Sequence, residues 1–333
     1  MKERDESLKV YFIGTTNGLE RDYIESTKLF TKTFYLDSQG FKRKLSLSNF
    51  QTIFKYFKAK HQSKKILKSL NCNMVVGMGG YVTGSVLRSA LDLKIKTVIH
   101  EQNSVYGLTN KLLKKRVNLV LLAYNIEQNN KTFIVGNPRI SEIYQKYKYL
   151  LHHNPHRNVL IVGGSRGANR INDLIISLKD EFERRDIEVL LITGNKYYQE
   201  NLDKIKELSN QRFIIQGFVD DLPKYLIDAR VVVTRCGATT LSEIMALKRV
   251  ALLIPSPNVT NNHQERNALE IVRRQGALMI KEDEVTKEKL LINIINLLDN
   301  EHLRKRIMNN LNMIADYNSC EKFIEKLDEL MNN

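Results

Sequence analysis

Short apolar runs that alternate with helix-like stretches are the feature of this sequence that most restricts its fold. Runs of this length, apolar throughout, are typical of parallel strands buried on both faces, and the helices between them supply the crossovers. Five runs occur in the first half of the chain and six in the second. The strands expected from them are 9–13, 74–77, 96–99, 119–122, 133–135, 159–162, 189–192, 213–215, 231–233, 251–254 and 277–280.

Two such series predict an α/β protein with two doubly wound domains. The length of 333 residues is ample for two hydrophobic cores. The pattern and the charge both change near residues 136–158, so we expect an N-terminal domain over 1–138 and a second domain over 139–310. The polar helical pattern of 311–333 predicts a C-terminal helix that packs back toward the N-terminal domain.

Charge separates the two halves of the chain. Residues 1–150 hold 26 Lys and Arg against 11 Asp and Glu, whereas the remaining residues hold 26 of each kind. A basic half suits an anionic membrane surface or a nucleic acid. The plainer alternative is a lysine-rich chain whose charges are simply solvated.

The segment 45–70 has a basic amphipathic pattern. A helical stripe of apolar side chains has lysines interleaved with it, which is compatible with a helix that lies on a membrane. The alternative is that the stripe covers the sheet, as crossover helices do. The stripe consists of Leu47, Phe50, Ile53, Phe54 and Phe57.

Several functional classes are disfavoured by simple counts. No apolar run approaches the 18–20 or so residues that a membrane-spanning helix needs, and the first ten residues contain no apolar signal segment. Cys72, Cys236 and Cys320 lie far apart with no CxxC pair. That usage suits a reducing cytosol and argues against a zinc site or a disulfide framework.

Two glycine-rich turns follow expected strands and precede helix-like patterns. In the first, Gly163, Gly164 and Ser165 offer backbone amides, a hydroxyl and a helix N-terminus, which together suit a diphosphate. It lacks the lysine of a Walker loop and the spacing of a dinucleotide fold, and a purely structural turn is the alternative. The second turn is a weaker candidate for an anion pocket and contains Gly79, Gly80, Tyr81 and Gly84.

Polar side chains gather at three further places. Glu243 falls in the first turn of a helix after a strand, where a carboxylate can accept both hydroxyls of a ribose. Gln264 and Asn267 follow a proline-bounded loop and can reach sugar hydroxyls. His100, Glu101 and Asn103 end a strand, where a carboxylate can act as a general base or orient an acceptor hydroxyl. Helix-dipole stabilisation by Glu243 and structural roles for His100 and Glu101 are the alternatives.

Six motifs in this order and at these intervals make the chain resemble the MurG family, the peptidoglycan N-acetylglucosaminyltransferases. They are GGYVTGS (79–85), IHEQNSVYGLTNKLL (99–113), VGNPR (135–139), VGGSRGANRIN (162–172), TRCGATTLSEIMAL (234–247) and HQERNA (263–268). The resemblance runs from about Val10 to Ile280. It implies a GT-B fold, in which two Rossmann-like domains face a central cleft.

The resemblance also implies an activity and its substrates. The C-terminal domain would bind UDP-N-acetylglucosamine. The N-terminal domain would meet undecaprenyl-diphospho-N-acetylmuramoyl-pentapeptide at the cytoplasmic face of the cell membrane, as a peripheral protein. The transfer would be inverting, with no cofactor and no metal held by a DxD motif. The sugar-nucleotide motifs speak against a nucleic-acid partner.

Residue roles follow from the same resemblance. Ser165 and Arg139 would contact the donor diphosphate, and Glu243 the ribose hydroxyls. Gln264 and Asn267 would lie by the sugar hydroxyls, with Asn103 reaching from the facing domain. The backbone near Phe218 would hold uracil. The loop with Gly79, Gly80, Tyr81 and Gly84 would hold the acceptor diphosphate.

One departure from the family pattern affects catalysis. The family begins with a strand and a GGTGGH-type loop whose histidine is a leading base candidate, and no residue of this sequence matches them. We therefore expect the first strand of the N-terminal domain to be missing, and Glu101 or His100 to be the remaining base candidates. The alternatives are a UDP-sugar-binding form with little transfer, or another GT-B protein such as a diacylglycerol glycosyltransferase or a UDP-sugar epimerase.

Overall fold

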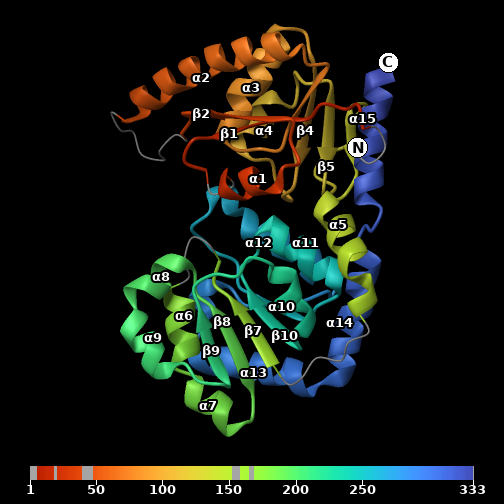
Figure 1. The fold of residues 1–333 in the computed structure, drawn as a ribbon. Helices are drawn as coiled ribbons and strands as arrows, with labels where there is room; N and C mark the ends of the chain where they lie inside the picture. Colours follow the sequence, from red (N-terminus) through yellow and green to blue (C-terminus); the bar gives the residue numbers. More distant parts are fainter. Residues whose placement is uncertain (1–5, 19–20, 40–47, 152–157, 165–168, 333) are drawn as a thin grey trace. The chain divides into compact units, whose positions relative to one another are not determined.

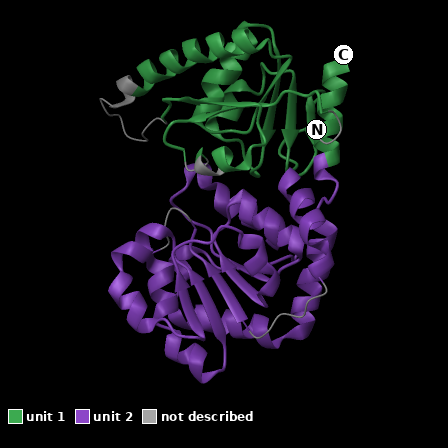
Figure 2. Cartoon of the chain, viewed as in Figure 1, with its two compact units in different colours: residues 1–136, 321–333 green, residues 137–320 purple. Residues whose placement is uncertain are grey.

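The chain forms two compact units (Figure 2). The structure is a computed structural model that describes residues 6–18, 21–39, 48–151, 158–164 and 169–332. Unit 1 comprises Met1–Gly136 together with Glu321–Asn333, and unit 2 comprises Asn137–Cys320. The boundaries expected from the sequence, after residues 138 and 310, differ from these by two and ten residues.

Unit 2 is built on one six-stranded sheet in which every pair of neighbours is parallel (Figure 1). The spatial order is β12-β11-β10-β7-β8-β9, so the direction of winding reverses between β7 and β10. Open α/β sheets bind ligands at such a reversal, beyond the carboxyl ends of the strands. The strands are β7 (Asn158–Val162), β8 (Glu188–Ile192), β9 (Phe213–Gln216), β10 (Val231–Thr234), β11 (Ala251–Leu253) and β12 (Leu278–Met279).

The helices of unit 2 bury one large hydrophobic core with this sheet. Local signals set their starts, because Asn137, Thr286 and Asn300 each accept a backbone N–H as helix caps. The helices are α5 (Pro138–Tyr147), α6 (Asn169–Ile176), α7 (Lys179–Arg184), α8 (Asn195–Glu200), α9 (Leu202–Leu208), α10 (Leu222–Asp228), α11 (Ala238–Leu247), α12 (His263–Val272), α13 (Lys287–Asp299) and α14 (Glu301–Ile314). Short 3₁₀ turns span Lys148–Leu150, Thr260–Asn262 and Glu282–Glu284.

Unit 1 contains two parallel sheets. One pairs β1 (Tyr11–Thr15) with β2 (Lys32–Leu36), and the other has the order β3-β4-β5-β6. The strands of the second sheet are β3 (Met74–Gly77), β4 (Lys96–Glu101), β5 (Leu119–Leu122) and β6 (Thr132–Ile134). All the strands expected from the apolar runs are present, and β2 is an additional strand that the sequence reading missed.

The C-terminal residues complete unit 1. Its helices are α1 (Arg21–Thr27), α2 (Ser48–Leu70), α3 (Tyr81–Asp92), α4 (Leu108–Leu113) and the later part of α15 (Ser319–Asn332). Leu327 of α15 is buried in a cluster with Val98 and Leu121. The Lys96 ammonium donates to the Leu330 and Met331 carbonyls at 2.8 and 3.0 Å, which satisfies acceptors at the end of α15.

Helix α2 does not use its apolar stripe to cover the sheet. Ile53, Phe54 and Phe57 are 43%, 72% and 62% exposed, so the covering interpretation is wrong for these residues. The buried positions of α2 include Ala59 and Leu67, and the helix packs against α3. Leu47 and the Phe50 side chain lie outside the described residues.

Candidate functional site

The first expected phosphate turn follows β7, at the point where the winding of the unit 2 sheet reverses. Gly164 has φ 86°, a conformation that favours glycine. Position 163 has no room for a side chain, because a Cβ there would lie 2.9 Å from Asn172 Oδ1 and 3.3 Å from the Ile192 carbonyl oxygen. Asn172 in turn donates to the Thr193 carbonyl at 3.1 Å. Ser165 lies outside the described residues.

Arg139 and Glu243 meet beside this end of the sheet. Arg139, in the first turn of α5, donates from Nε and Nη2 to Glu243 Oε1 at 3.0 and 2.6 Å. It also donates from Nη1 to Glu142 at 2.8 Å. The resemblance implies that Arg139 contacts a diphosphate and Glu243 a ribose. In the structure, the two side chains form hydrogen bonds to each other.

Burial sets the electrostatics of this pair. Glu243 lies on α11 and is almost fully buried, and this burial raises the pKa of its carboxyl even though Arg139 acts in the opposite direction. Burial alone would lower the pKa of Arg139, but its contacts with Glu243 and Glu142 raise that pKa overall. The pair therefore keeps a positive charge on Arg139 next to a carboxylate that is costly to ionise.

Gln264 and Asn267 tie the loops after β10 and β11 to α12. Gln264 Oε1 accepts the backbone N–H groups of Cys236 and Ser256 at 3.2 and 2.8 Å. Asn267 is fully buried and donates to the Cys236 carbonyl at 3.3 Å. These contacts hold the loop backbone at the carboxyl edge of the sheet, where a sugar-binding role had been expected for both side chains.

The residue expected near uracil, Phe218, follows β9 and is exposed. The preceding Gly217 has little room, because a Cβ there would come within 2.9 Å of Asn195 Oδ1 and 3.0 Å of Tyr198 Cβ. The backbone at the end of β9 is thus packed closely against α8. The described donor candidates of unit 2 therefore come from four places. Arg139 lies on α5, Glu243 on α11, Gln264 and Asn267 on α12, and Phe218 beyond β9.

In unit 1, the second glycine turn connects β3 to α3. Gly79 and Gly80 have φ values of 94° and 84°, and Tyr81 at the start of α3 is exposed. Gly84 differs from the other members of the expected loop, because it lies within α3. A Cβ at Gly84 would be 3.4 Å from Thr109 Cγ2 and 3.9 Å from Tyr56 Cε2, so this position of α3 faces α4 and α2 at ordinary contact distances.

Glu101 lies at the end of β4 and accepts four hydrogen bonds. Its Oε1 accepts the backbone N–H and the side-chain amide of Asn103 at 3.1 and 3.0 Å. Its Oε2 accepts the Gly107 N–H and the Asn110 amide, each at 2.9 Å. Glu101 is buried, and its carboxylate fastens the loop that carries Asn103.

His100 is also an interior residue. Its Nε2 lies 3.0 Å from the Gly136 carbonyl oxygen, and its ring meets Phe323 of α15 edge-on at a centroid distance of 5.3 Å. Burial lowers the pKa of the imidazole. Neither His100 nor Glu101 presents an exposed atom for proton transfer in this structure, so the geometry favours structural roles for both over the expected role as base.

The described part of the chain has two further properties that bear on function. Within it, no three His, Cys, Asp or Glu side chains gather as a metal site would require. Among the same residues, no helix is both long and apolar enough to cross a bilayer.

Comparison with known proteins identifies the family. Residues 2–122 match the glycosyltransferase family 28 N-terminal domain, and residues 158–327 match its C-terminal domain. A relative from Bacillus thuringiensis subsp. konkukian is 36% identical over 342 residues, which cover 100% of this chain and 92% of the relative. Its name is UDP-N-acetylglucosamine--N-acetylmuramyl-(pentapeptide) pyrophosphoryl-undecaprenol N-acetylglucosamine transferase 1. The chain belongs to the MurG family of glycosyltransferases.

A second relative and two solved structures are also similar to this chain. A relative from Halalkalibacterium halodurans with the corresponding transferase name is 38% identical over 308 residues, covering 90% of this chain and 84% of the relative. The crystal structure of Acinetobacter baumannii MurG has a TM-score of 0.74 at 24% identity and covers 98% of this chain and 93% of that one. The S. aureus MnaA–UDP structure has a TM-score of 0.69 at 14% identity, with coverage of 98% and 97%. The expected GT-B fold of two Rossmann-like domains is confirmed.

Proposed function

We propose that this chain transfers N-acetylglucosamine from UDP-N-acetylglucosamine to undecaprenyl-diphospho-N-acetylmuramoyl-pentapeptide. Membership of the MurG family and the names of its full-length relatives support the reaction. The structural observation that carries the proposal is the reversal point of the unit 2 sheet. There the Gly163–Gly164 turn lies at a strand end, where the fold class binds nucleotides.

The donor is held by residues of unit 2 in this proposal. Arg139 contacts the diphosphate, and so does Ser165, which lies outside the described residues. Glu243 accepts the ribose hydroxyls. Arg139 donates twice to Oε1, which leaves Oε2 as the acceptor for the hydroxyls. The backbone at Phe218 holds uracil, and Gln264 and Asn267 shape the edge of the sugar site.

The transfer is a direct displacement with inversion. The C4 hydroxyl of the acceptor muramoyl residue attacks the anomeric carbon of the donor, the bond from that carbon to the diphosphate oxygen breaks, and a base removes the hydroxyl proton. The departing UDP gains negative charge, which backbone amides of the turn and Arg139 stabilise. Asn103 of unit 1, fixed by Glu101, is the proposed contact from that unit to the donor sugar.

The acceptor is proposed to bind unit 1. Gly79, Gly80 and Tyr81 place a glycine turn at the N-terminus of α3, a geometry that suits its diphosphate. Helices α2 and α4 of unit 1 expose large apolar side chains and also carry lysines. The apolar side chains are Ile53, Phe54, Phe57, Leu108 and Leu112. Exposed apolar groups on helices that carry lysines suit an anionic lipid surface, and we propose that unit 1 lies on the cytoplasmic face of the membrane.

The test is transfer of labelled N-acetylglucosamine from the UDP sugar to a lipid-linked muramoyl-pentapeptide acceptor. The same sample is examined for thermal stabilisation by UDP. We expect transfer by the wild-type chain and at least tenfold less by a Glu243→Ala variant, with Glu142→Ala, which removes an exposed carboxylate from the same cluster, as the matched control. UDP binding without transfer would limit the function to sugar-nucleotide binding. Absence of both in a folded sample would refute the donor site.

A further inference from the structure

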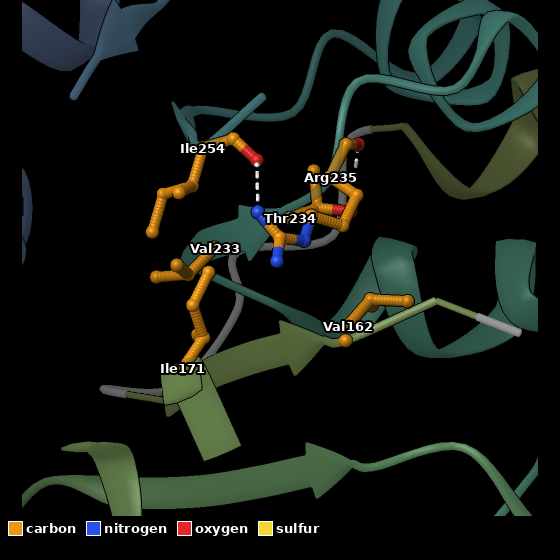
Figure 3. A pocket seen from close by; sticks show the side chains of 7 residues that line it. Val162, Ile171, Val233, Thr234, Arg235 and Ile254 are labelled. Atoms are coloured by element: carbon orange, nitrogen blue, oxygen red, sulfur yellow. Dashed lines mark hydrogen bonds between the residues drawn. The ribbon is translucent and has the colours of Figure 1, made fainter. Parts of the chain in front are cut away.

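Arg235 is a buried cation at the reversal point of the unit 2 sheet. The proposed reaction gives this residue no role. Arg235 follows β10 directly and is 9% exposed. Its Nη1 donates to Glu282 Oε2 at 2.7 Å. The same nitrogen donates to the Ile254 carbonyl at 3.2 Å (Figure 3). The guanidinium is thereby held between the ends of β10, β11 and β12.

The pairing with Glu282 leaves the guanidinium incompletely satisfied. Arginine and a carboxylate commonly form two parallel hydrogen bonds, whereas here a single nitrogen carries both contacts. Among the described residues, the buried Nε of Arg235 has no hydrogen-bond partner. An unsatisfied buried donor in a native structure calls for an explanation, and a function at that place is one.

The location of Arg235 supplies that explanation. Its Cγ lies 3.6 Å and its Cβ 3.9 Å from where a Cβ would stand on Gly164, so its side chain packs beneath the glycine turn. Arg235 also lines a small pocket with Val162, Gly163 and Ile171 of the β7–α6 region (Figure 3). A positive charge in this interior acts through a lower dielectric than water and is screened little by salt.

Glu282, which pairs with the Arg235 guanidinium, is itself held in place. It follows β12, which is separated from β7 by β11 and β10. Arg170 of α6 donates to the Glu282 and Val285 carbonyls at 2.8 and 3.0 Å, which fixes the backbone that carries this carboxylate. Arg235 therefore contacts Gly164 through its Cβ and Cγ, while Glu282 and the Ile254 carbonyl fix the position of its guanidinium.

We propose that Arg235 is a positioning residue of the diphosphate site, which supports the Gly163–Gly164 turn and places a fixed positive charge behind it. This inference rests on the proposed function, because it assumes that the donor's diphosphate binds at the turn. Arg235 does not touch the ligand. It strengthens binding of the two phosphates and leaves binding of the nucleoside unaffected.

The test compares uridine, UMP and UDP as ligands, measured by calorimetry on the full chain. We expect Arg235→Met to weaken UDP binding about tenfold, corresponding to about 1.4 kcal/mol, while uridine affinity changes less than twofold. Arg235→Lys, which keeps the charge, should recover part of the loss. Arg212→Met is the matched control, because it removes an exposed arginine before β9, at the opposite edge of the sheet.

Glu282→Gln keeps the proposal testable if the Arg235 variants fold poorly. Removal of the counter-charge should increase the preference for UDP over uridine. Equal losses for uridine and UDP in the Arg235 and Glu282 variants would show a merely structural role and overturn the proposal, as would an unchanged preference in Arg235→Met. If the wild-type chain bound neither ligand, the proposed function itself would fail. A wild-type preference for UDP that Arg235→Met retains in full would refute the role of Arg235 alone.

Discussion

Arg139 and Glu243, 104 residues apart in the chain, share one carboxylate oxygen through two guanidinium nitrogens at 3.0 and 2.6 Å. The contact joins the first turn of α5 to α11, and both helices begin at the carboxyl edge of the unit 2 sheet. Two residues with separate expected roles thus form one hydrogen-bonded ion pair. Anything that changes the ionisation of Glu243 also changes the partner of Arg139.

Replacement of Glu243 by Gln should change how stability depends on pH. Burial raises the folded-state pKa of this carboxyl above its ordinary value of 4.5, so the folded protein binds a proton more tightly than the unfolded chain. The stabilisation from this group is complete below pH 4.5 and is lost as the pH rises through the raised pKa. Denaturant unfolding between pH 4 and 7 should show the wild type losing stability relative to Glu243→Gln. A wild-type advantage that grows with pH would contradict this.

Glu101→Gln should act through loop geometry. The carboxylate accepts four N–H groups, and the amide nitrogen of Gln would face two of these donors. We expect a loss of about 1–3 kcal/mol in the free energy of unfolding and a lower kcat/KM. The acid limb of the pH–rate profile should survive, because Glu101 does not transfer the proton. Disappearance of that limb in a variant of normal stability would instead make Glu101 the base.

Gly163→Ala and Gly237→Ala form a matched pair at the ends of β7 and β10. The added Cβ at Gly163 would meet Asn172 Oδ1 at 2.9 Å and two backbone oxygens at 3.3 Å, whereas at Gly237 it would meet no described atom within 4 Å. We expect Gly163→Ala to cost about 1–3 kcal/mol of stability, as overpacking commonly does, and to weaken UDP binding. Gly237→Ala should unfold close to the wild-type temperature. Equal thermal stability of the two variants would show that the Gly163 turn adjusts freely.

His100 should make the chain less stable in mild acid. Burial lowers its folded-state pKa below the ordinary 6.5, so the unfolded chain binds the proton more tightly. The stabilisation is present above pH 6.5 and is lost as the pH falls through the lowered pKa. His100→Gln, whose amide can still donate to the Gly136 carbonyl, should show a shallower loss between pH 7 and 5. His61→Gln, on the exposed side of α2, is the control and should follow the wild type.

Phe54→Glu and Phe57→Glu should weaken attachment to anionic vesicles. Both rings are exposed on α2, and burial of such a side chain in a lipid surface contributes roughly 1.5–3 kcal/mol. We expect at least tenfold weaker cosedimentation with phosphatidylglycerol vesicles and unchanged UDP binding. Met313→Glu places the same charge on an exposed apolar position of unit 2 and should bind vesicles as the wild type does. An equal effect of all three substitutions would count against a specific surface on unit 1.

Local pattern was sufficient for most of the fold. The apolar runs predicted all strands except β2, whose sequence KTFYL begins with two polar residues and has only one buried position. The glycine turns after β3 and β7 were also visible, since glycines between a strand and a helix are a local signal. Gly84 was grouped with the first of these turns by proximity in sequence, although it lies within α3.

The sequence by itself determined the alternation of strands and helices, the two-domain α/β architecture and, through its ordered motifs, the family. These are properties of neighbouring residues and of their order along the chain. Only the tertiary structure decided that Glu101 fastens a loop, that Arg139 pairs with Glu243, that Arg235 lies beneath Gly164 and that the stripe on α2 is exposed. The physical reason is that burial and hydrogen-bond partners depend on which distant segments meet, and a side chain's chemistry follows from both.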